Sequence, residues 1–411
     1  MATGSAVAPL VERAGFEWQP LVLGRGANPG VARVDDQPSG EDENLRAFFR
    51  ATYEGMVPTL RLQAELRRND LLWRPAEAAR ATIDIVRAVA PAAILVDHLA
   101  FGATLGLRAA GISYADVVLG HPTALPVRGE RYGVPGAWPV AFRPNQGELA
   151  DLGRLADAVA RRFTDDWNRA LRAIDPTAAA VNNAFHVHGD IVLFNYPAAL
   201  HDARREGDLP AAHSFLGSSA RDEALDPDAA EWLGRSADRP LVVVSFGSFL
   251  SARADVLARV ASALRRADVR VALATGSADR GILGALPDDW LVRPFLPQVA
   301  LVRHAAVAIT HGGNGGVTEA LTHGVPVLAL PFSTDQFVVA ADLERTGVGR
   351  AADPNRVTDA EVRRAVMELL SEPRRGAVHD LGQQMRADPG PARARRALTA
   401  LTTVSTAAAG S

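Results

Sequence analysis

Short apolar runs alternate with longer amphipathic runs along the whole chain. The apolar runs are of strand length and lie at 94–97, 114–119, 191–194, 241–248, 269–274, 306–310 and 325–330. Strands that alternate with helix-length segments are typical of β-α units packed around parallel sheets. The pattern therefore predicts an α/β protein with a parallel sheet in each half of the chain.

Helical spacing and composition together divide the chain into domains. Apolar positions recur at helical spacing over 6–14, 43–68, 76–89, 102–110, 149–173 and 255–266. The segment 218–238 is rich in Asp, Ala, Ser and Arg, as expected of a linker with a short helix. We therefore predict an N-terminal domain over 1–217, a C-terminal domain over 239–388, and a terminal helix and tail over 389–411.

Composition excludes several kinds of chemistry. All 44 basic residues are arginine, so Schiff-base catalysis, pyridoxal phosphate anchoring and a Walker lysine are impossible. Cys is absent, which excludes disulfides, thiolate nucleophiles and cysteine-ligated metal sites. A net charge of -3 argues against a nucleic-acid partner. The sequence contains neither an apolar run of the roughly 20 residues that a membrane helix needs nor a signal peptide, so we expect a cytoplasmic protein.

The most informative stretch runs from Ala306 to Gln336. A strand ending at Thr310 meets His311, four glycines interrupted by Asn314, and then a helix that carries Glu319. Glycines let the backbone approach an anion closely, and the helix N-terminus presents unpaired N–H groups, so the pattern predicts a phosphate site. Glu319 would then accept hydrogen bonds from a ribose. The alternatives are a glycine-rich loop without a ligand and a glutamate that only complements the helix dipole.

Several spaced elements carry a family resemblance. The segment from Phe295 through His311 to Asp335 and Gln336, together with the strand end at 244–248, resembles the donor-binding signature of the UDP-glycosyltransferase family. That family includes antibiotic and plant natural-product glycosyltransferases. The resemblance implies a GT-B fold, in which two Rossmann-like domains face each other across a cleft, the C-terminal one binding donor and the N-terminal one binding acceptor.

The resemblance also implies roles for particular residues. Phe295 and the backbone of Leu296 would hold the base of a UDP- or dTDP-hexose, with Gln298 beside it. Phe295 replaces the tryptophan of the plant enzymes, which leaves the base identity open. The expected diphosphate ligands are Ser248, His311, Gly313, Asn314, Gly315 and Gly316, the last three mainly through their backbone. Glu319 would hold the ribose, and Asp335 with Gln336 the sugar hydroxyls. The implied reaction is inverting hexose transfer to a small lipophilic acceptor, without a metal or another cofactor.

The catalytic base is harder to assign. Family members use a histidine after the first strand, held by an aspartate to which Asp97 corresponds. The first β-α unit is expected to be absent here, so His98 and His121 are the nearest replacements. Asp97 could instead cap the helix that follows it. An exposed sheet edge in place of that unit would favour poor solubility or a homodimer. Without the histidine of that unit, transfer is expected to be slow, and a form extended upstream is expected to be far more active.

Other features leave alternatives open. His186 and His188 alternate as in a strand and could share a metal, although no third ligand lies near in sequence. Phe48, Phe49 and Tyr53 lie on a helix where the family binds acceptors, although helical aromatics more often fill a core. Two rival functions remain, a degenerate nucleotide-sugar-binding partner of an active enzyme and a nucleotide-sugar epimerase or hydrolase.

Overall fold

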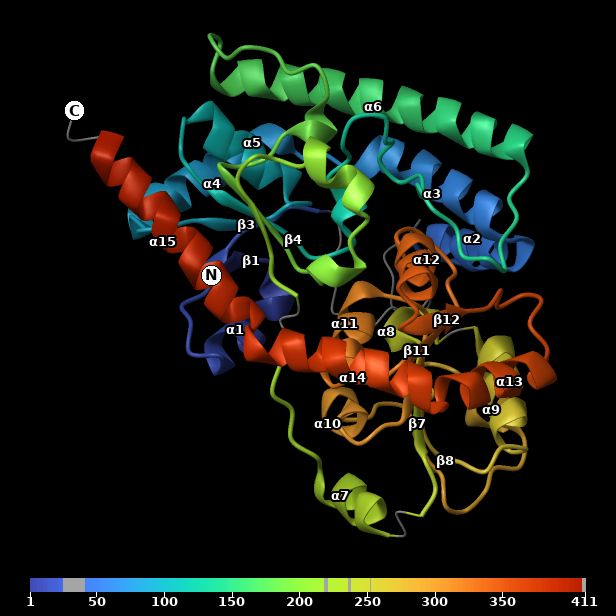
Figure 1. Cartoon of the computed structure of the whole chain (residues 1–411). Helices are drawn as coiled ribbons and strands as arrows, with labels where there is room; N and C mark the ends of the chain where they lie inside the picture. Colours follow the sequence, from blue (N-terminus) through green and yellow to red (C-terminus); the bar gives the residue numbers. More distant parts are fainter. Residues whose placement is uncertain (25–40, 218–220, 236–237, 252, 409–411) are drawn as a thin grey trace.

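Two parallel β-sheets, one in each half of the chain, organise the computed structural model (Figure 1). The structure describes residues 1–24, 41–217, 221–235, 238–251 and 253–408. The N-terminal sheet has the strand order β3-β4-β5-β6. Its strands are β3 (Leu95–Asp97), β4 (Ala115–Val118), β5 (Ile191–Phe194) and β6 (His213–Phe215). A separate parallel pair joins β1 (Ala2–Thr3) to β2 (Gln19–Pro20).

The C-terminal sheet has the order β12-β11-β10-β7-β8-β9. Its strands are β7 (Leu241–Ser245), β8 (Arg270–Ala274), β9 (Leu291–Arg293), β10 (Val307–Thr310), β11 (Val327–Ala329) and β12 (Gly349–Ala351). The chain proceeds from β7 toward one edge and from β10 toward the other, so the order reverses between these neighbours. Open α/β sheets bind ligands where the order reverses, at the carboxyl ends of the strands. The topology therefore points to the loops after β7 and β10.

The helices of the N-terminal half include one break that the sequence pattern did not predict. They are α1 (Ala8–Arg13), α2 (Glu41–Glu54), α3 (Met56–Asp70), α4 (Pro75–Val89), α5 (Phe101–Ala109) and α6 (Gln146–Ile174). The single helix expected over 43–68 is divided at Gly55, which has a φ of +127°. Glycine is the residue that adopts this backbone conformation readily, so the chain turns there between α2 and α3.

The helices of the C-terminal half begin within the predicted linker. They are α7 (Pro227–Gly234), α8 (Gly247–Leu250), α9 (Ala254–Leu264), α10 (Gln298–Val302), α11 (Asn314–Thr322), α12 (Gln336–Thr346), α13 (Asp359–Leu369), α14 (Glu372–Ala387) and α15 (Gly390–Ala408). The predicted short linker helix is thus present as α7. Central strands such as β7 are buried between helices, with Val242 and Val244 both at 0% exposure, which explains their continuous apolar sequence.

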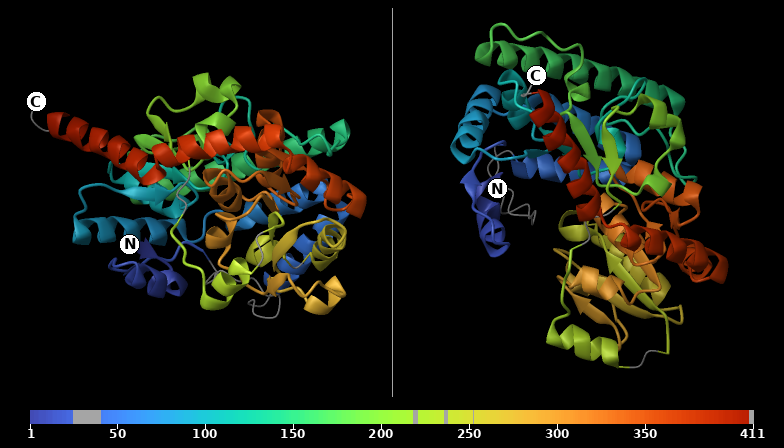
Figure 2. Two further views of the ribbon diagram at one scale, coloured as in Figure 1. Left: turned by 60° about the horizontal axis from the view of Figure 1, so that its bottom comes forward. Right: turned by 60° about the vertical axis from the view of Figure 1, so that its left-hand side comes forward.

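The terminal helix joins the two halves of the molecule. After α14, α15 crosses to the N-terminal half, as both views of Figure 2 show. Ala394, Ala397 and Leu398 pack against the apolar face of β4 and β5. The guanidinium of Arg393 donates to the carbonyl of Phe215 at 2.9 Å. The terminal helix expected from the sequence therefore exists and binds the opposite domain.

Helix α2 docks against the C-terminal half through a buried arginine. Arg253 is 1% exposed, donates to the carbonyl of Thr52 at 3.1 Å and lies 3.8 Å from the ring centroid of Tyr53. Phe48 lies within the apolar core of the C-terminal domain, and Phe49 packs against that core. The acceptor-binding alternative for these three aromatics is therefore not supported, because they form the contact between the domains.

The strand predictions are confirmed to within a few residues. The predicted runs 94–97 and 325–330 correspond to shorter strands, since β3 and β11 each have three residues. Strands β6, β9 and β12 were not predicted, since three residues carry little periodic signal.

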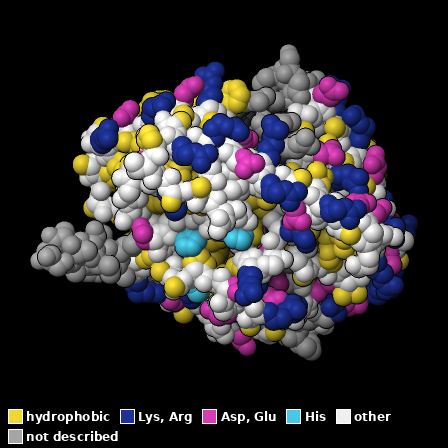
Figure 3. Space-filling view, turned by 90° about the horizontal axis from the view of Figure 1, so that it is seen from above, with side chains coloured by type: hydrophobic (Ala, Val, Ile, Leu, Met, Phe, Trp, Pro, Cys, Tyr) yellow, Lys and Arg dark blue, Asp and Glu magenta, His cyan; other side chains and the backbone are white. Residues whose placement is uncertain are grey.

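Within the described part of the chain, none of the helices combines the length and apolar character needed to cross a bilayer. Figure 3 shows acidic and basic side chains intermingled on the face in view.

Candidate functional site

The turn between β10 and α11 is built from glycine around the ring of His311. The hydroxyl of Thr310 accepts the backbone N–H of Gly312 at 2.8 Å, and Gly312 has a φ of +84°. A Cβ at Gly313 would overlap the Nε2 atom of His311, and one at Gly247, after β7, would lie 3.4 Å from its Cε1. The ring therefore occupies the point where the ends of the two central strands meet.

The first turn of α11 is open to an anion. Gly313 precedes the helix without a side-chain cap, and a Cβ at Gly315 would meet nothing within 4 Å. Unpaired backbone N–H groups and the positive end of the helix dipole therefore face this space. Burial lowers the pKa of His311 to about 4 despite the opposing charge of Asp335, so the imidazole is neutral near pH 7.

A second group of residues predicted to bind the sugar donor lies one turn further along α11. The Nε2 of Gln298, at the start of α10, lies 3.4 Å from Oε2 of Glu319. A Cβ at Gly316 would lie 3.5 Å from the same amide nitrogen. Burial raises the pKa of Glu319, and its neighbour Glu223 adds to the rise while Arg221 opposes it. Gln298, Gly316 and Glu319 therefore lie close together in the structure.

The remaining base-binding candidates lie on the loop after β9. Phe295 is 59% exposed, so its ring is available to a ligand, and Leu296 is partly buried against the core. Ser248 lies in the short helix α8, and its side chain is outside the described part of the structure.

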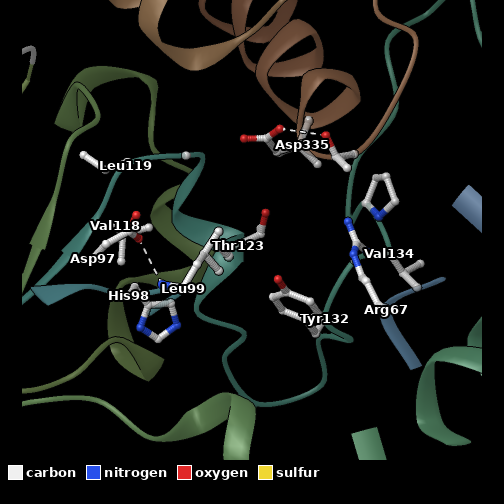
Figure 4. A pocket seen from close by; sticks show the side chains of 16 residues that line it. Arg67, Asp97, His98, Leu99, Val118, Leu119, Thr123, Tyr132, Val134 and Asp335 are labelled. Atoms are coloured by element: carbon white, nitrogen blue, oxygen red, sulfur yellow. Dashed lines mark hydrogen bonds between the residues drawn. The ribbon is translucent and has the colours of Figure 1, made fainter. Parts of the chain in front are cut away.

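A cavity of about 220 Å³ lies between the two domains. Figure 4 shows the side chains that line it, with Asp97 on one side, Asp335 on another, and Tyr132 and Thr123 between Asp97 and Arg67. Most other lining residues are apolar. Asp97 ends β3 in the N-terminal domain, whereas Asp335 immediately precedes α12 in the C-terminal domain. The cavity thus brings together carboxylates from both domains.

Asp97 and His98 differ sharply in accessibility. The Oδ1 atom of Asp97 accepts the backbone N–H of Leu99 at 3.0 Å. The residue is exposed and lines the cavity. It is not the N-cap of α5, because Ala100 occupies that position. His98 is 3% exposed, with its Nδ1 3.7 Å from Oδ2 of buried Asp116. Figure 4 shows the imidazole turned away from Asp335. The prediction of His98 as the base is not supported by this position.

His121 is a structural residue in this fold. Its Nδ1 accepts the backbone N–H of Thr123 at 3.1 Å, which leaves the proton on Nε2 to donate to Asp342 at 3.0 Å. Tyr196 donates its hydroxyl to the same carboxylate at 2.7 Å, and Arg345 contacts the other oxygen at 2.8 Å. Because both ring nitrogens are engaged and the ring is 3% exposed, His121 cannot serve as the expected base.

Asp335 and Gln336 have different surroundings. Asp335 lines the cavity, and its Oδ2 accepts the backbone N–H of His121 at 3.0 Å. Gln336 is 8% exposed, and its Oε1 accepts the N–H groups of Phe332 and Ser333 at 3.0 and 3.2 Å. A sugar contact by Gln336 would require these bonds to break. The geometry therefore supports Asp335 as a ligand-facing residue and gives Gln336 the role of shaping its loop.

The side chain of Asn314 is used elsewhere, which leaves only its backbone for the expected diphosphate contact. Its amide donates to the carbonyls of Leu119 at 2.6 Å and Asn195 at 2.7 Å, both in the N-terminal domain. Leu119 and Gly120 line the cavity. The side chain is therefore turned away from the anion-binding turn, and it fastens the start of α11 to the cavity wall.

Two residues that line the cavity were not predicted from the sequence. They are Arg67, on α3, and Tyr132, on an irregular loop, and neither carries a periodic signal. The strand-like alternation of His186 and His188 does not correspond to a strand, since Ala184–His186 form a 3-10 turn and the Nδ1 of His188 contacts the carbonyl of Gly189 at 2.7 Å. Among the residues that the structure describes, no cluster of three or more His, Asp or Glu could hold a metal.

Comparisons with known proteins agree with this geometry. A family model described as "UDP-glucoronosyl and UDP-glucosyl transferase" matches residues 195–381. The "4'-demethylrebeccamycin synthase" of Lentzea aerocolonigenes is 32% identical over 187 residues, which are 45% of this chain and 42% of that protein. The chain thus matches less than half the length of such curated relatives.

Solved structures match over almost the whole chain. The "glycosyltransferase VinC in complex with DTDP" has a TM-score of 0.66 at 18% identity and covers 98% of this chain and 91% of that one. The "Spinosyn Rhamnosyltransferase SpnG complexed with spinosyn aglycone" has a TM-score of 0.60 at 18% identity, covering 97% and 91%. At these identities the likeness concerns the fold, which is GT-B as the sequence analysis predicted.

Proposed function

We propose that the chain, whose residues 195–381 match the model of the UDP-glucoronosyl and UDP-glucosyl transferase family, is a glycosyltransferase of the natural-product type. It would move a hexose from a UDP- or dTDP-sugar to a hydroxyl of a small lipophilic acceptor, with inversion and without a metal. The observation that carries this proposal is the single cavity that holds Asp97 of the N-terminal domain and Asp335 of the C-terminal domain.

The donor would lie on the C-terminal domain. Its diphosphate would accept hydrogen bonds from the backbone of the first turn of α11, where the helix dipole also favours negative charge. His311 would donate a hydrogen bond as a neutral imidazole, in keeping with its low pKa. Glu319 would hold the ribose, and Asp335 would hold a sugar hydroxyl at the rim of the cavity.

The acceptor would occupy the cavity with its reacting hydroxyl beside Asp97. The Asp97 carboxylate takes the hydroxyl proton while the acceptor oxygen forms a bond to the anomeric carbon. The bond between that carbon and the phosphate oxygen breaks, and its electron pair leaves with the nucleoside diphosphate. Hydrogen-bond donors at the start of α11 stabilise the developing charge, a contribution that is commonly the largest in such sites.

One specific observation favours a second candidate function. Both histidines near the cavity are buried, with His121 fully engaged and His98 set against Asp116. A cavity whose described neighbouring histidines are both inaccessible also fits a nucleotide-sugar-binding partner of an active enzyme. Unlike the first candidate, such a protein would bind the sugar donor without transferring the sugar.

The donor assignment is tested by replacing Glu319 with alanine. We expect the affinity for UDP or dTDP to fall by about 1–3 kcal/mol, the cost of leaving ribose hydroxyls without their partner. Isothermal titration calorimetry in the presence of a chelator measures this, and wild-type affinity should be the same with and without the chelator. Glu361→Ala, at an exposed position on α13 far along the chain, is the matched control. Unchanged affinity in Glu319→Ala would remove the ribose role.

A further inference from the structure

Arg67 lies on α3 and lines the cavity on the side away from Asp97 (Figure 4). Its guanidinium makes no ion pair with any carboxylate among the described residues, and its recorded contact is with the ring of Tyr132. Two buried arginines elsewhere in the described chain are paired with carboxylates, Arg205 with Glu130 and Arg253 with Asp255, whereas Arg67 is partly buried. Arg67 therefore places a positive charge on the cavity wall that no described carboxylate pairs with directly.

The surrounding loop is shaped to hold that charge. The guanidinium carbon of Arg67 lies 5.3 Å from the ring centroid of Tyr132. The next residue, Gly133, has a φ of +77°, and a Cβ there would overlap the Nη1 atom of Arg67. Glycine at this position provides both the backbone conformation and the room for the guanidinium. Arg67 is thus held at the wall of the cavity by ring and backbone contacts.

The charges of the cavity restrict where an anion could bind. Asp97 and Asp335 would repel a carboxylate at their end, and the oxygens of Asp335 already accept hydrogen bonds from His121 and Thr334. Among the described residues that line the cavity, Arg67 is the one arginine, and it lies beside apolar walls that include Val134 and Pro135. A planar guanidinium pairs with a carboxylate through two parallel hydrogen bonds, which gives direction as well as affinity.

The desolvation cost of such a pair would be moderate here. Arg67 also borders a second hollow of about 400 Å³, formed between α3, α4 and α6 and rimmed by exposed Arg74 and Glu77. A carboxylate that reaches Arg67 from the cavity therefore meets a cation that keeps access to water. Ion pairs that are fully removed from water lose much of their Coulomb gain to desolvation, and this one would not be fully removed.

We propose that Arg67 binds an acidic group of the acceptor, so that the cavity selects small aromatic or alicyclic alcohols that also carry a carboxylate. The proposal rests on the proposed function of the cavity as the acceptor site. With the carboxylate at Arg67, the far end of the acceptor lies toward Asp97, and its hydroxyl faces the proton acceptor. Arg67 is a specificity residue in this account and takes no part in the bond changes.

The experiment compares 4-hydroxycinnamate with its methyl ester, which lacks the charge and carries one additional methyl group. Calorimetric affinities for both compounds are measured with the full chain, in the wild type and in Arg67→Met, Arg67→Lys and Arg61→Met. Arg61 lies on α3 as well and is exposed, so its variant is the matched control. We expect the wild type and the control to prefer the acid. Arg67→Met should lose about 10- to 100-fold for the acid only, as expected for one charge-assisted contact, and Arg67→Lys should lose less.

Equal wild-type affinities for acid and ester, no binding of the acid, or an equal loss for both compounds in Arg67→Met would overturn the proposal. Melting temperatures of the variants separate a folding defect from a binding defect, and Arg67→Lys retains the charge if Arg67→Met does not fold. Transfer is assayed independently. An acid preference that depends on Arg67 supports the inference even if no glycoside forms. The absence of a glycoside would count against the proposed function alone.

Discussion

Replacing Asp97 with asparagine is expected to reduce sugar transfer by about 10²- to 10⁴-fold, the usual contribution of a general base. Asparagine has nearly the same shape and can still accept the backbone N–H of Leu99, but it cannot take a proton. Donor binding at α11 should therefore be unchanged. The measurement is the initial rate of nucleoside diphosphate release with a saturating phenolic acceptor, beside calorimetry of the donor.

The control for this variant is Asp84→Asn, which changes a carboxylate of the same domain that is 73% exposed on α4. It should leave the rate as in the wild type. A rate in Asp97→Asn within a fewfold of wild type would contradict the assignment. Asp335→Asn should then be examined, because Asp335 is the other carboxylate of the cavity.

Replacing Asp342 with alanine is expected to lower the free energy of unfolding by about 3–5 kcal/mol, as for the loss of one member of a buried ionic network. The carboxylate is 5% exposed and accepts hydrogen bonds from His121, Tyr196 and Arg345. Its removal takes the carboxylate acceptor away from the Nε2–H of His121 and the hydroxyl of Tyr196, both in buried residues. Denaturant unfolding measures the change. Asp228→Ala, at a position 84% exposed, should stay within about 0.5 kcal/mol of wild type.

The same carboxylate makes a pH-dependent contribution. Burial raises the pKa of Asp342, but the hydrogen bonds and charges of His121 and Arg345 outweigh it and hold the pKa below 3.8. A lowered folded-state pKa stabilises the protein above the unfolded value, and this stability is lost as pH falls through the folded value. The stability difference between wild type and Asp342→Asn should therefore be constant near pH 7 and shrink below about pH 4. A difference that grows on acidification would contradict this.

Sequence patterns were most informative where one local rule decides the structure. Central strands such as β7 and β10 are continuous apolar runs because helices cover both faces of their sheet, and the glycine-rich run after Thr310 forms the turn into α11, with Gly313 leaving room for the ring of His311. These features could be predicted without knowledge of the tertiary structure. The break at Gly55 was missed because a lone glycine in a helical pattern does not reveal its backbone angle.

Features that depend on contacts between the domains could not be predicted. His121 is adjacent in space to Asp342, 221 residues further along the chain, and nothing local distinguishes it from a loop histidine available for catalysis. Asn314 lies within the predicted phosphate motif, yet its amide is used by carbonyls of the other domain. Gln336 was assigned from the motif alone, whereas the curvature of its loop directs the side chain back onto Phe332 and Ser333.

The central claim, that one cavity unites a donor on the C-terminal domain with an acceptor on the N-terminal domain, is tested most directly by proton NMR of a reaction mixture. Wild-type protein is incubated with α-linked UDP- and dTDP-hexoses, neutral and acidic phenols, and a chelator. We predict a β-glycoside of a phenol, formed in equal amount to the nucleoside diphosphate. Free or epimerised sugar without any glycoside, or unchanged donor throughout the panel, would contradict the account.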